Sequence, residues 1–404
     1  MRLTSYSPRI FGIILLTLSV ASLAHAEKKY GPGVTDTEIK IGQTMPYSGP
    51  GSTYGTIGKT EAAYFKMIND QGGINGRKIN LISLDDGYSP PKTVEQTRRL
   101  VEEESVLLTF QSLGTAHNTA VQKYMNAKQV PQLFVATGAT KWGDPEHFPW
   151  TMGWQPPYQH ESHIYAKYLL KNKPDAKVAI LYQNDDFGKD YLKGFKDGLG
   201  DKAVKMIVAE VSYEPTDSTI DSQIVSLQAS GADVIFVAAI PKFAAQSIRK
   251  VFDIGWRPLY VLTNVSSSIA TVLQPAGLEK SVGVVSSAYI KDPTDPAWKD
   301  DKAVKDYVSL MRKYYPDGNP DDFANLYGYA AAQTLAQVLR QCGDDLSREN
   351  VIRQAANLKD FEVAGLLPGV RINTSPTDYF PIEQLQLMRF DGKRWVRFGE
   401  LFER

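Results

Sequence analysis

The sequence predicts an α/β protein built from two sheets of mainly parallel strands. From Ile39 onward, short runs rich in β-branched and aromatic residues alternate with longer stretches of helical period, the pattern of βαβ units. A cluster of aromatic residues and prolines, Trp150–Pro157, separates a first set of units from a second set. The length of 404 residues suits two domains of ~100 to 200 residues each.

The first set of units begins with the strand Ile39–Gln43 and a turn over Ser48–Gly51. A helix follows, which Gly72-Gly73 ends, and its apolar residues recur at spacings that fit one face: Ala62, Phe65, Met67 and Ile68. The remaining predicted elements are strands over Lys78–Leu84, Val106–Gln111 and Val130–Val135, and a helix over Thr93–Glu104.

The second set of units begins after the aromatic and proline cluster. Two of its strands, Asp233–Ala239 and Leu259–Leu262, are apolar enough to be buried on both faces. The other predicted elements are a helix over Tyr158–Leu170, a strand over Val178–Tyr182, a helix after Asp185 and a strand over Lys205–Val211.

The last part of the chain predicts two long helices, Trp298–Tyr315 and Asp322–Gln341. Two alternating runs, Gln384–Phe390 and Arg394–Phe398, follow them, and Asp391-Gly392 lies between the runs. Asp-Gly between two such runs indicates a β-hairpin.

The first 26 residues have the features of a cleavable secretory signal. Arg2 and Arg9 precede or border the apolar run Ile10–Val20, which is too short to cross a bilayer, and the segment ends in Ala24-His25-Ala26. We therefore expect a mature, periplasmic chain that starts near Glu27.

The cysteine content and the net charge exclude further classes of protein. The single cysteine, Cys342, allows no internal disulfide and lies too far from the cleavage site to carry an N-terminal lipid anchor. The 45 basic and 45 acidic residues balance, and removal of Arg2 and Arg9 leaves 43 against 45. This near-neutral charge argues against nucleic acid as a partner.

Several short segments resemble the leucine/isoleucine/valine-binding family of periplasmic solute-binding proteins. Their order and spacing carry the resemblance over essentially the whole mature chain. The segments are Tyr47–Pro50, Asn69–Arg77, Leu84–Asp86, Ala136–Thr140, Asp186–Gly188 and Ser230–Val234.

The resemblance implies a periplasmic-binding-protein type I fold: two Rossmann-like lobes, joined by three hinge strands, with the ligand cleft between them. Residues 27–156 plus 288–365 would form lobe 1, and residues 157–287 plus 366–404 would form lobe 2. Small ligands bind at the carboxyl ends of parallel strands and between domains, and ligand contacts with both sides would stabilise lobe closure.

The function that the resemblance implies is that of the extracytoplasmic binding component of an ABC importer. Such a protein would be a monomer without a cofactor, delivering its ligand to an ABC permease in the inner membrane. A ligand sensor of the same fold is the alternative of another class.

On lobe 1, the resemblance assigns a carboxylate grip to hydroxyls and free amides. Tyr54 would form an aromatic wall, and the grip would consist of Ser112, Gly114, Thr115, Gly138 and Thr140. Hydrogen bonds to a charged group suit such residues. The structural alternative is that they are turn and cap residues.

On lobe 2, the resemblance assigns ligand contacts to Phe187, Ile240 and Asn264, and Tyr289 is predicted to join the site from a cleft-facing segment. Where the family presents an acidic group to the ammonium of an amino acid, this chain has Thr263-Asn264-Val265, which offers only a neutral carbonyl. A buried ammonium needs a counter-charge. Two ligand classes therefore stay open: a small hydrophobic amino acid, or an aromatic carboxylate without an amine, benzoate-like or cinnamate-like.

Other chemistry finds little support in the sequence. The run Gly51–Thr60 ends in Gly-Lys-Thr, but a phosphate-binding loop would need glycine at Thr53. His160 and His163 are not accompanied by a cysteine or an HExxH arrangement, so we expect no metal site.

Two pairs of adjacent carboxylates, Asp85-Asp86 and Asp185-Asp186, are better explained as cap and turn residues than as a general acid and base. No G-x-S-x-G elbow is present either. The sequence therefore predicts a binding protein and not an enzyme.

Overall fold

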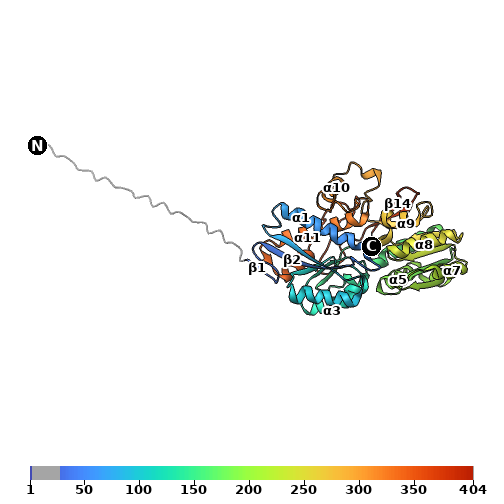
Figure 1. Cartoon of the computed structure of the whole chain (residues 1–404), viewed down its shortest axis with the longest axis horizontal. Helices are drawn as coiled ribbons and strands as arrows, with labels where there is room; N and C mark the ends of the chain where they lie inside the picture. The colour runs from blue at the N-terminus through green and yellow to red at the C-terminus, as the bar shows by residue number, and fades with distance from the viewer. Residues whose placement is uncertain (2–27, 404) are drawn as a thin grey trace.

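The computed structural model describes residue 1 and residues 28–403 (Figure 1). The predicted signal segment therefore lies, apart from residue 1, outside the described residues. Within residues 28–403, no helix is both long and apolar enough to span a bilayer.

The first sheet has five parallel strands in the order β3-β2-β4-β5-β6. Its strands are β2 (Glu38–Met45), β3 (Lys78–Asp85), β4 (Leu108–Phe110), β5 (Gln132–Val135) and β6 (Thr151–Gly153). The helices of this lobe are α1 (Gly55–Asp70), α2 (Pro90–Arg98), α3 (Thr115–Ala127), α10 (Lys302–Tyr314), α11 (Phe323–Cys342) and α12 (Arg348–Ala355). Helix α1 packs against α10 and α11, so chain segments far apart in sequence complete the first lobe.

The second sheet has seven strands in the order β14-β13-β11-β10-β9-β7-β8, of which β13 and β14 pair antiparallel. Its strands are β7 (Val178–Gln183), β8 (Ile207–Tyr213), β9 (Val234–Ala238), β10 (Leu259–Leu262), β11 (Val285–Ala288), β13 (Leu385–Phe390) and β14 (Trp395–Phe402). Its helices include α4 (Tyr158–Asn172), α5 (Asp186–Leu199), α7 (Asp221–Ala229) and α8 (Pro241–Asp253). All residues of the central strand β9 are buried, as expected of a parallel strand covered on both faces.

The two lobes lie side by side, with α1, α3 and α11 at one end of the molecule and α5, α7 and α8 at the other (Figure 1). The chain passes from the first sheet to the second after β6, returns after β11 and passes over again before β13. The hinge role of these crossings and the predicted lobe bounds stay predictions. A two-stranded pair of β1 (Lys29–Tyr30) and β12 (Asp345–Leu346) lies at the edge of the first lobe.

Most predicted elements are confirmed within a few residues, and β10 has the predicted bounds. The hairpin at Asp391-Gly392 is confirmed by the pairing of Phe390 with Trp395. The predicted helix Trp298–Tyr315 begins later, at Lys302, because the Asp301 side chain accepts a hydrogen bond from Val304 N (3.0 Å) and caps it there.

Other boundaries were wrong for local reasons. Lys205 and Met206 belong to α6 (Ala203–Met206) and not to the strand that follows. The helix predicted over Thr93–Glu104 begins at Pro90 and becomes π-helical from Arg99. On α1 the predicted face was partly wrong, since Ala62 is exposed whereas Tyr64 is buried with Phe65 and Ile68.

Candidate ligand-binding site

A cavity of about 60 Å³ lies between the lobes and is lined by residues of both. A buried water needs only ~10 to 15 Å³ of such space, so the cavity has room for more than a single water. Its lining contains tyrosine, phenylalanine and aliphatic side chains but no aspartate, glutamate, lysine, arginine or histidine. Seven of the ten predicted site residues line it: Tyr54, Gly114, Thr115, Phe187, Ile240, Asn264 and Tyr289.

On the first lobe, the cavity wall includes the amino end of α3. Gly114 precedes the helix and has no side chain to cap it, so no side chain bonds the first N–H groups, which begin at Thr115. Free N–H groups and the positive end of a helix dipole favour a bound anion. This end of α3 is therefore suited to a carboxylate.

The backbone at Gly114 requires glycine. Its φ is 102°, a conformation that other residues rarely adopt. A Cβ atom here would also lie 2.3 Å from Nδ1 of His117. Next to it, the Thr115 and Thr137 hydroxyls form a hydrogen bond of 2.6 Å. The turn thus brings backbone amides and a hydroxyl to the cavity without any charged side chain.

On the second lobe, the first turn of α5 is capped by the side chain that precedes it. The carboxylate of Asp185 accepts hydrogen bonds from Phe187 N (3.0 Å) and Gly188 N (3.3 Å). Helix α8 begins with Pro241, which has no N–H group. The amino ends of α5 and α8 therefore have fewer free donors in their first turns than the amino end of α3.

Asn264 lies at the carboxyl end of β10 and is held in place by the buried carboxyl of Glu161. Oε1 of Glu161 accepts from Asn264 N at 2.7 Å and from Tyr165 OH at 2.6 Å, and Oε2 accepts from Tyr191 OH at 2.6 Å. Burial raises the pKa of Glu161. Glu161 does not line the cavity, so it does not replace the acidic group that is missing at Asn264.

The other three predicted site residues do not line the cavity. The Ser112 hydroxyl accepts from Thr44 N at 3.2 Å within the first lobe. Gly138 packs closely against the chain crossing, where its carbonyl accepts from Tyr158 N at 2.7 Å. Both backbone N–H and hydroxyl of Thr140 donate to Asp190, at 2.8 and 3.0 Å. Only at Thr140 are the donors expected to hold a ligand already used within the protein, whereas Ser112 and Gly138 accept hydrogen bonds there.

Several lining residues were not predicted. Tyr88 follows the carboxyl end of β3, where the strand-end rule could have found it. Gln155 joins two other lining tyrosines, since it donates to Tyr158 OH (3.3 Å) and accepts from Tyr327 OH (3.2 Å). Tyr327 comes from α11, and no local pattern marks it as a cavity residue.

The sequence profile of the family described as "Periplasmic binding protein" matches residues 38–394. The chain belongs to this family. Leu/Ile/Val-binding protein homolog 1 of Brucella abortus (strain 2308) is 24% identical to this binding protein over 322 residues, which cover 77% of this chain and 81% of the relative.

Two solved structures share the fold of this binding protein. One is a branched chain amino acid ABC transporter from Thermus thermophilus with bound valine (TM-score 0.83, 16% identity, covering 92% of this chain and 98% of that chain). The other is a fatty acid ABC transporter substrate-binding protein from Thermomonospora curvata (TM-score 0.77, 22% identity, covering 93% and 95%). At these identities the likeness concerns the fold, which is confirmed as the periplasmic-binding-protein type I fold. The relatives are binding proteins and not enzymes.

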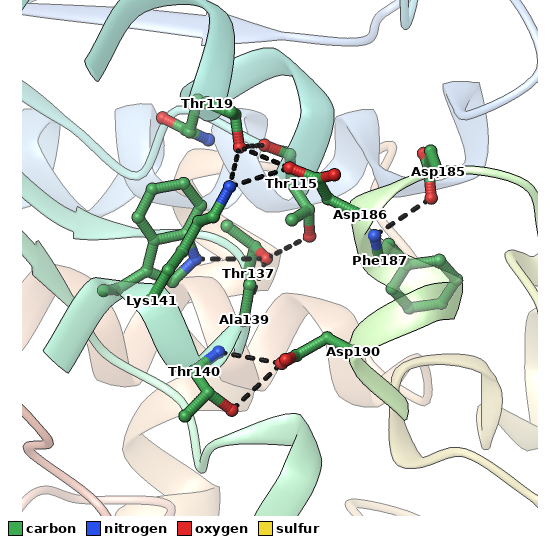
Figure 2. Close-up of polar contacts among 12 residues, drawn as sticks. Thr115, Thr119, Thr137, Ala139, Thr140, Lys141, Asp185, Asp186, Phe187 and Asp190 are labelled. Carbon is green, nitrogen blue, oxygen red and sulfur yellow. Dashed lines mark hydrogen bonds and ion pairs between the residues drawn. The ribbon is translucent and has the colours of Figure 1, made fainter. Parts of the chain in front are cut away.

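The two lobes of the binding protein are in direct contact beside the cavity. Figure 2 shows Lys141 of the first lobe bonded to Asp186 of the second (2.7 Å), with the Thr119 hydroxyl also donating to Asp186 (3.2 Å). The bonds from Thr140 to Asp190 lie in the same view. We call these contacts the rim latch. They cross between the lobes, so they would break if the lobes moved apart.

We expect the double variant Lys141→Ala/Asp190→Ala to populate an open conformation without ligand, because alanine removes the acceptor of both Thr140 bonds. The Lys141 and Asp186 side chains are 38% and 45% exposed, so the pair is weak and screened by salt. Small-angle X-ray scattering would show a larger radius of gyration for the ligand-free variant, and high salt would shift the wild type in the same direction.

The matched control is Lys173→Ala, which removes an ion pair to Asp233 (2.9 Å) of similar exposure inside the second lobe. An unchanged radius in the double variant would contradict the latch.

The bond to Lys141 holds the pKa of Asp186 below its usual value of 3.8. The contribution of this pair is therefore present above pH 3.8 and lost as the pH falls through the lowered pKa.

Proposed function

We propose that this chain is the extracytoplasmic binding component of an ABC importer of the branched-chain amino acid type, and that it binds a small organic carboxylate whose remainder is uncharged. The single observation that carries the proposal is the uncapped amino end of α3 in a cavity without a charged side chain. Free amides there supply the donors that an acid group needs.

An amine on the ligand has no counterpart in this cavity. An ammonium buried among tyrosines, phenylalanines and aliphatic side chains would lose its hydration without gaining a carboxylate, which costs several kcal/mol in principle. The aromatic share of the lining suits a flat or branched apolar group instead. These points favour an acid without an amine over a hydrophobic amino acid.

The partners follow from the same proposal. The binding protein would close its lobes on the ligand as a monomer in the periplasm and deliver it to an ABC permease in the inner membrane. Ligand contacts with both lobes stabilise closure only to the extent that they are absent from the open form. The cavity lining contains no pair of groups suited to general acid and base chemistry, which supports binding without conversion.

A thermal-shift screen tests the proposal with benzoate, trans-cinnamate, L-leucine and L-valine. We expect an acid without an amine to raise the melting temperature, since a ligand at 100 times its Kd adds about 2.7 kcal/mol of stability. Benzamide and cinnamamide are the matched controls, because they keep the ring and lose the carboxylate. Stabilisation by leucine and valine alone would overturn the choice of ligand class.

A further inference from the structure

Two residues that line the cavity each have a polar side-chain atom that makes no hydrogen bond among the described residues. The two atoms are the side-chain oxygen Oδ1 of Asn264 and the hydroxyl of Tyr289. Both residues line the cavity, and they are only 6% and 3% exposed. Neither atom is among the fully buried side-chain atoms without a partner, so both remain accessible to water or to a ligand.

The other hydroxyls of the cavity already have partners. Four tyrosines besides Tyr289 line it, and each makes a hydrogen bond within the protein. The bonds run from Tyr54 to the carbonyl of Val265 (3.1 Å), from Gln183 to Tyr88 (3.3 Å), from Gln155 to Tyr158 (3.3 Å) and from Tyr327 to Gln155 (3.2 Å). Among the polar side-chain atoms of the residues that line the cavity, Oδ1 of Asn264 and the Tyr289 hydroxyl are thus the ones without any hydrogen bond within the described residues.

These two residues lie on neighbouring strand ends. Strands β10 and β11 are parallel with Val261 opposite Val285, so Asn264 lies level with Ala288, one residue before Tyr289. The Asn264 amide donates through Nδ2 to the carbonyl of Ser287. This bond fixes the orientation of the amide and leaves Oδ1 as the atom available to a ligand.

The two groups together select one kind of ligand group. Oδ1 of Asn264 can only accept a hydrogen bond, whereas a neutral tyrosine hydroxyl can donate one. Burial raises the pKa of Tyr289 well above its ordinary value, so its hydroxyl keeps its proton. A ligand hydroxyl can donate to Asn264 and accept from Tyr289 at once. An ammonium has donors only, and a hydrocarbon has neither.

We propose that the ligand is a hydroxylated organic acid, whose carboxylate binds the amino end of α3 and whose hydroxyl binds between Asn264 and Tyr289. The inference rests on the proposed function for its carboxylate end and adds the ligand group that Asn264 and Tyr289 would bind. It distinguishes hydroxy acids from the amino acids and from the unsubstituted acids of the same skeleton.

Isothermal titration calorimetry on the mature protein tests this with four probes of one skeleton. They are 3-phenylpropionate, 2-hydroxy-3-phenylpropionate, 3-(4-hydroxyphenyl)propionate and phenylalanine. We expect one of the two hydroxy acids to bind at least about 10-fold more tightly than 3-phenylpropionate, and phenylalanine to bind most weakly. The hydroxy acid that gains affinity shows whether the hydroxyl lies beside the carboxylate or at the far end of the ring.

Variants assign the effect to the two residues. Tyr289→Phe and Asn264→Leu should each reduce the preference for the hydroxy acid to less than about 3-fold, with little change for 3-phenylpropionate. Tyr327→Phe is the matched control, since it removes a cavity hydroxyl that is already bonded to Gln155, and it should keep the preference.

The outcomes separate the two proposals. Equal affinity for 3-phenylpropionate and both hydroxy acids would overturn the inference and leave the proposed carboxylate ligand standing. A preference that survives in both Tyr289→Phe and Asn264→Leu would overturn the assignment to these residues. Tightest binding of phenylalanine, or no binding of any probe, would contradict the proposed ligand class and the inference with it.

Discussion

The variant Gly114→Ala is expected to bind a carboxylate ligand at least about 100-fold more weakly than the wild type while still folding. The loss would combine two or more hydrogen bonds to a charged group, each worth about 1.5 to 3 kcal/mol. The physical reason is local, since alanine at a φ of 102° is strained and its Cβ would lie 2.3 Å from His117 Nδ1. Either Gly114 or the first turn of α3 must move, and the amides then no longer point at one place.

Titration calorimetry with the acid found in the screen measures this effect. The matched control is Gly72→Ala, because Gly72 has nearly the same φ, 101°, and a Cβ there would meet nothing within 4 Å. The control should lose about 1 kcal/mol of stability and keep its affinity. Wild-type affinity in Gly114→Ala would show that the amino end of α3 does not hold the ligand.

The variant Glu161→Leu is expected to lower the free energy of unfolding by about 4 kcal/mol. The carboxyl of Glu161 accepts hydrogen bonds from four donors, namely Asn264 N, Tyr165 OH, Tyr191 OH and Ser287 OH. Leucine leaves these buried donors without an acceptor, and each such group costs ~1 to 3 kcal/mol. Because the hydroxyls can partly rearrange, the total loss of stability is smaller than the sum of the costs of the four separate donors.

Urea unfolding followed by circular dichroism measures this loss. Glu210→Leu is the control, because Glu210 pairs with Lys196 (2.8 Å) at the surface and such pairs contribute only about 0 to 1 kcal/mol. A change of under about 1 kcal/mol in Glu161→Leu would mean that the network around Glu161 does not stabilise the second lobe.

Elements of the fold could be predicted from the sequence where their buried residues are apolar, and not where their buried residues are polar. Strands β9 and β10 were found because their buried runs are continuous. Helix α3 was missed because His117, Asn118 and Gln122 occupy much of its buried face, so the apolar period is weak. Asn118 is buried because its amide donates to the carbonyls of Ser112 (2.7 Å) and Gly114 (2.8 Å), a role that no periodicity reveals.

The candidate site was predictable where it is built from residues just after strands. Gly114, Phe187, Ile240 and Asn264 follow strands and line the cavity. Thr140 has the same kind of position, yet its donors are used by Asp190 of the other lobe. Such a contact depends on how the two lobes meet, which local patterns do not encode.

The cap that Asp185 forms on α5 makes the two sides of the cavity electrostatically different. Its carboxylate already occupies the amides that face α3 from across the lobes. Two helix ends therefore point toward the same space, but only one of them is electrostatically open to an acid. A molecule with acid groups at both ends would bring its second charge next to the Asp185 carboxylate. Under the proposed function, the Asp185 side chain would thus favour monoacids and a single orientation of the bound acid.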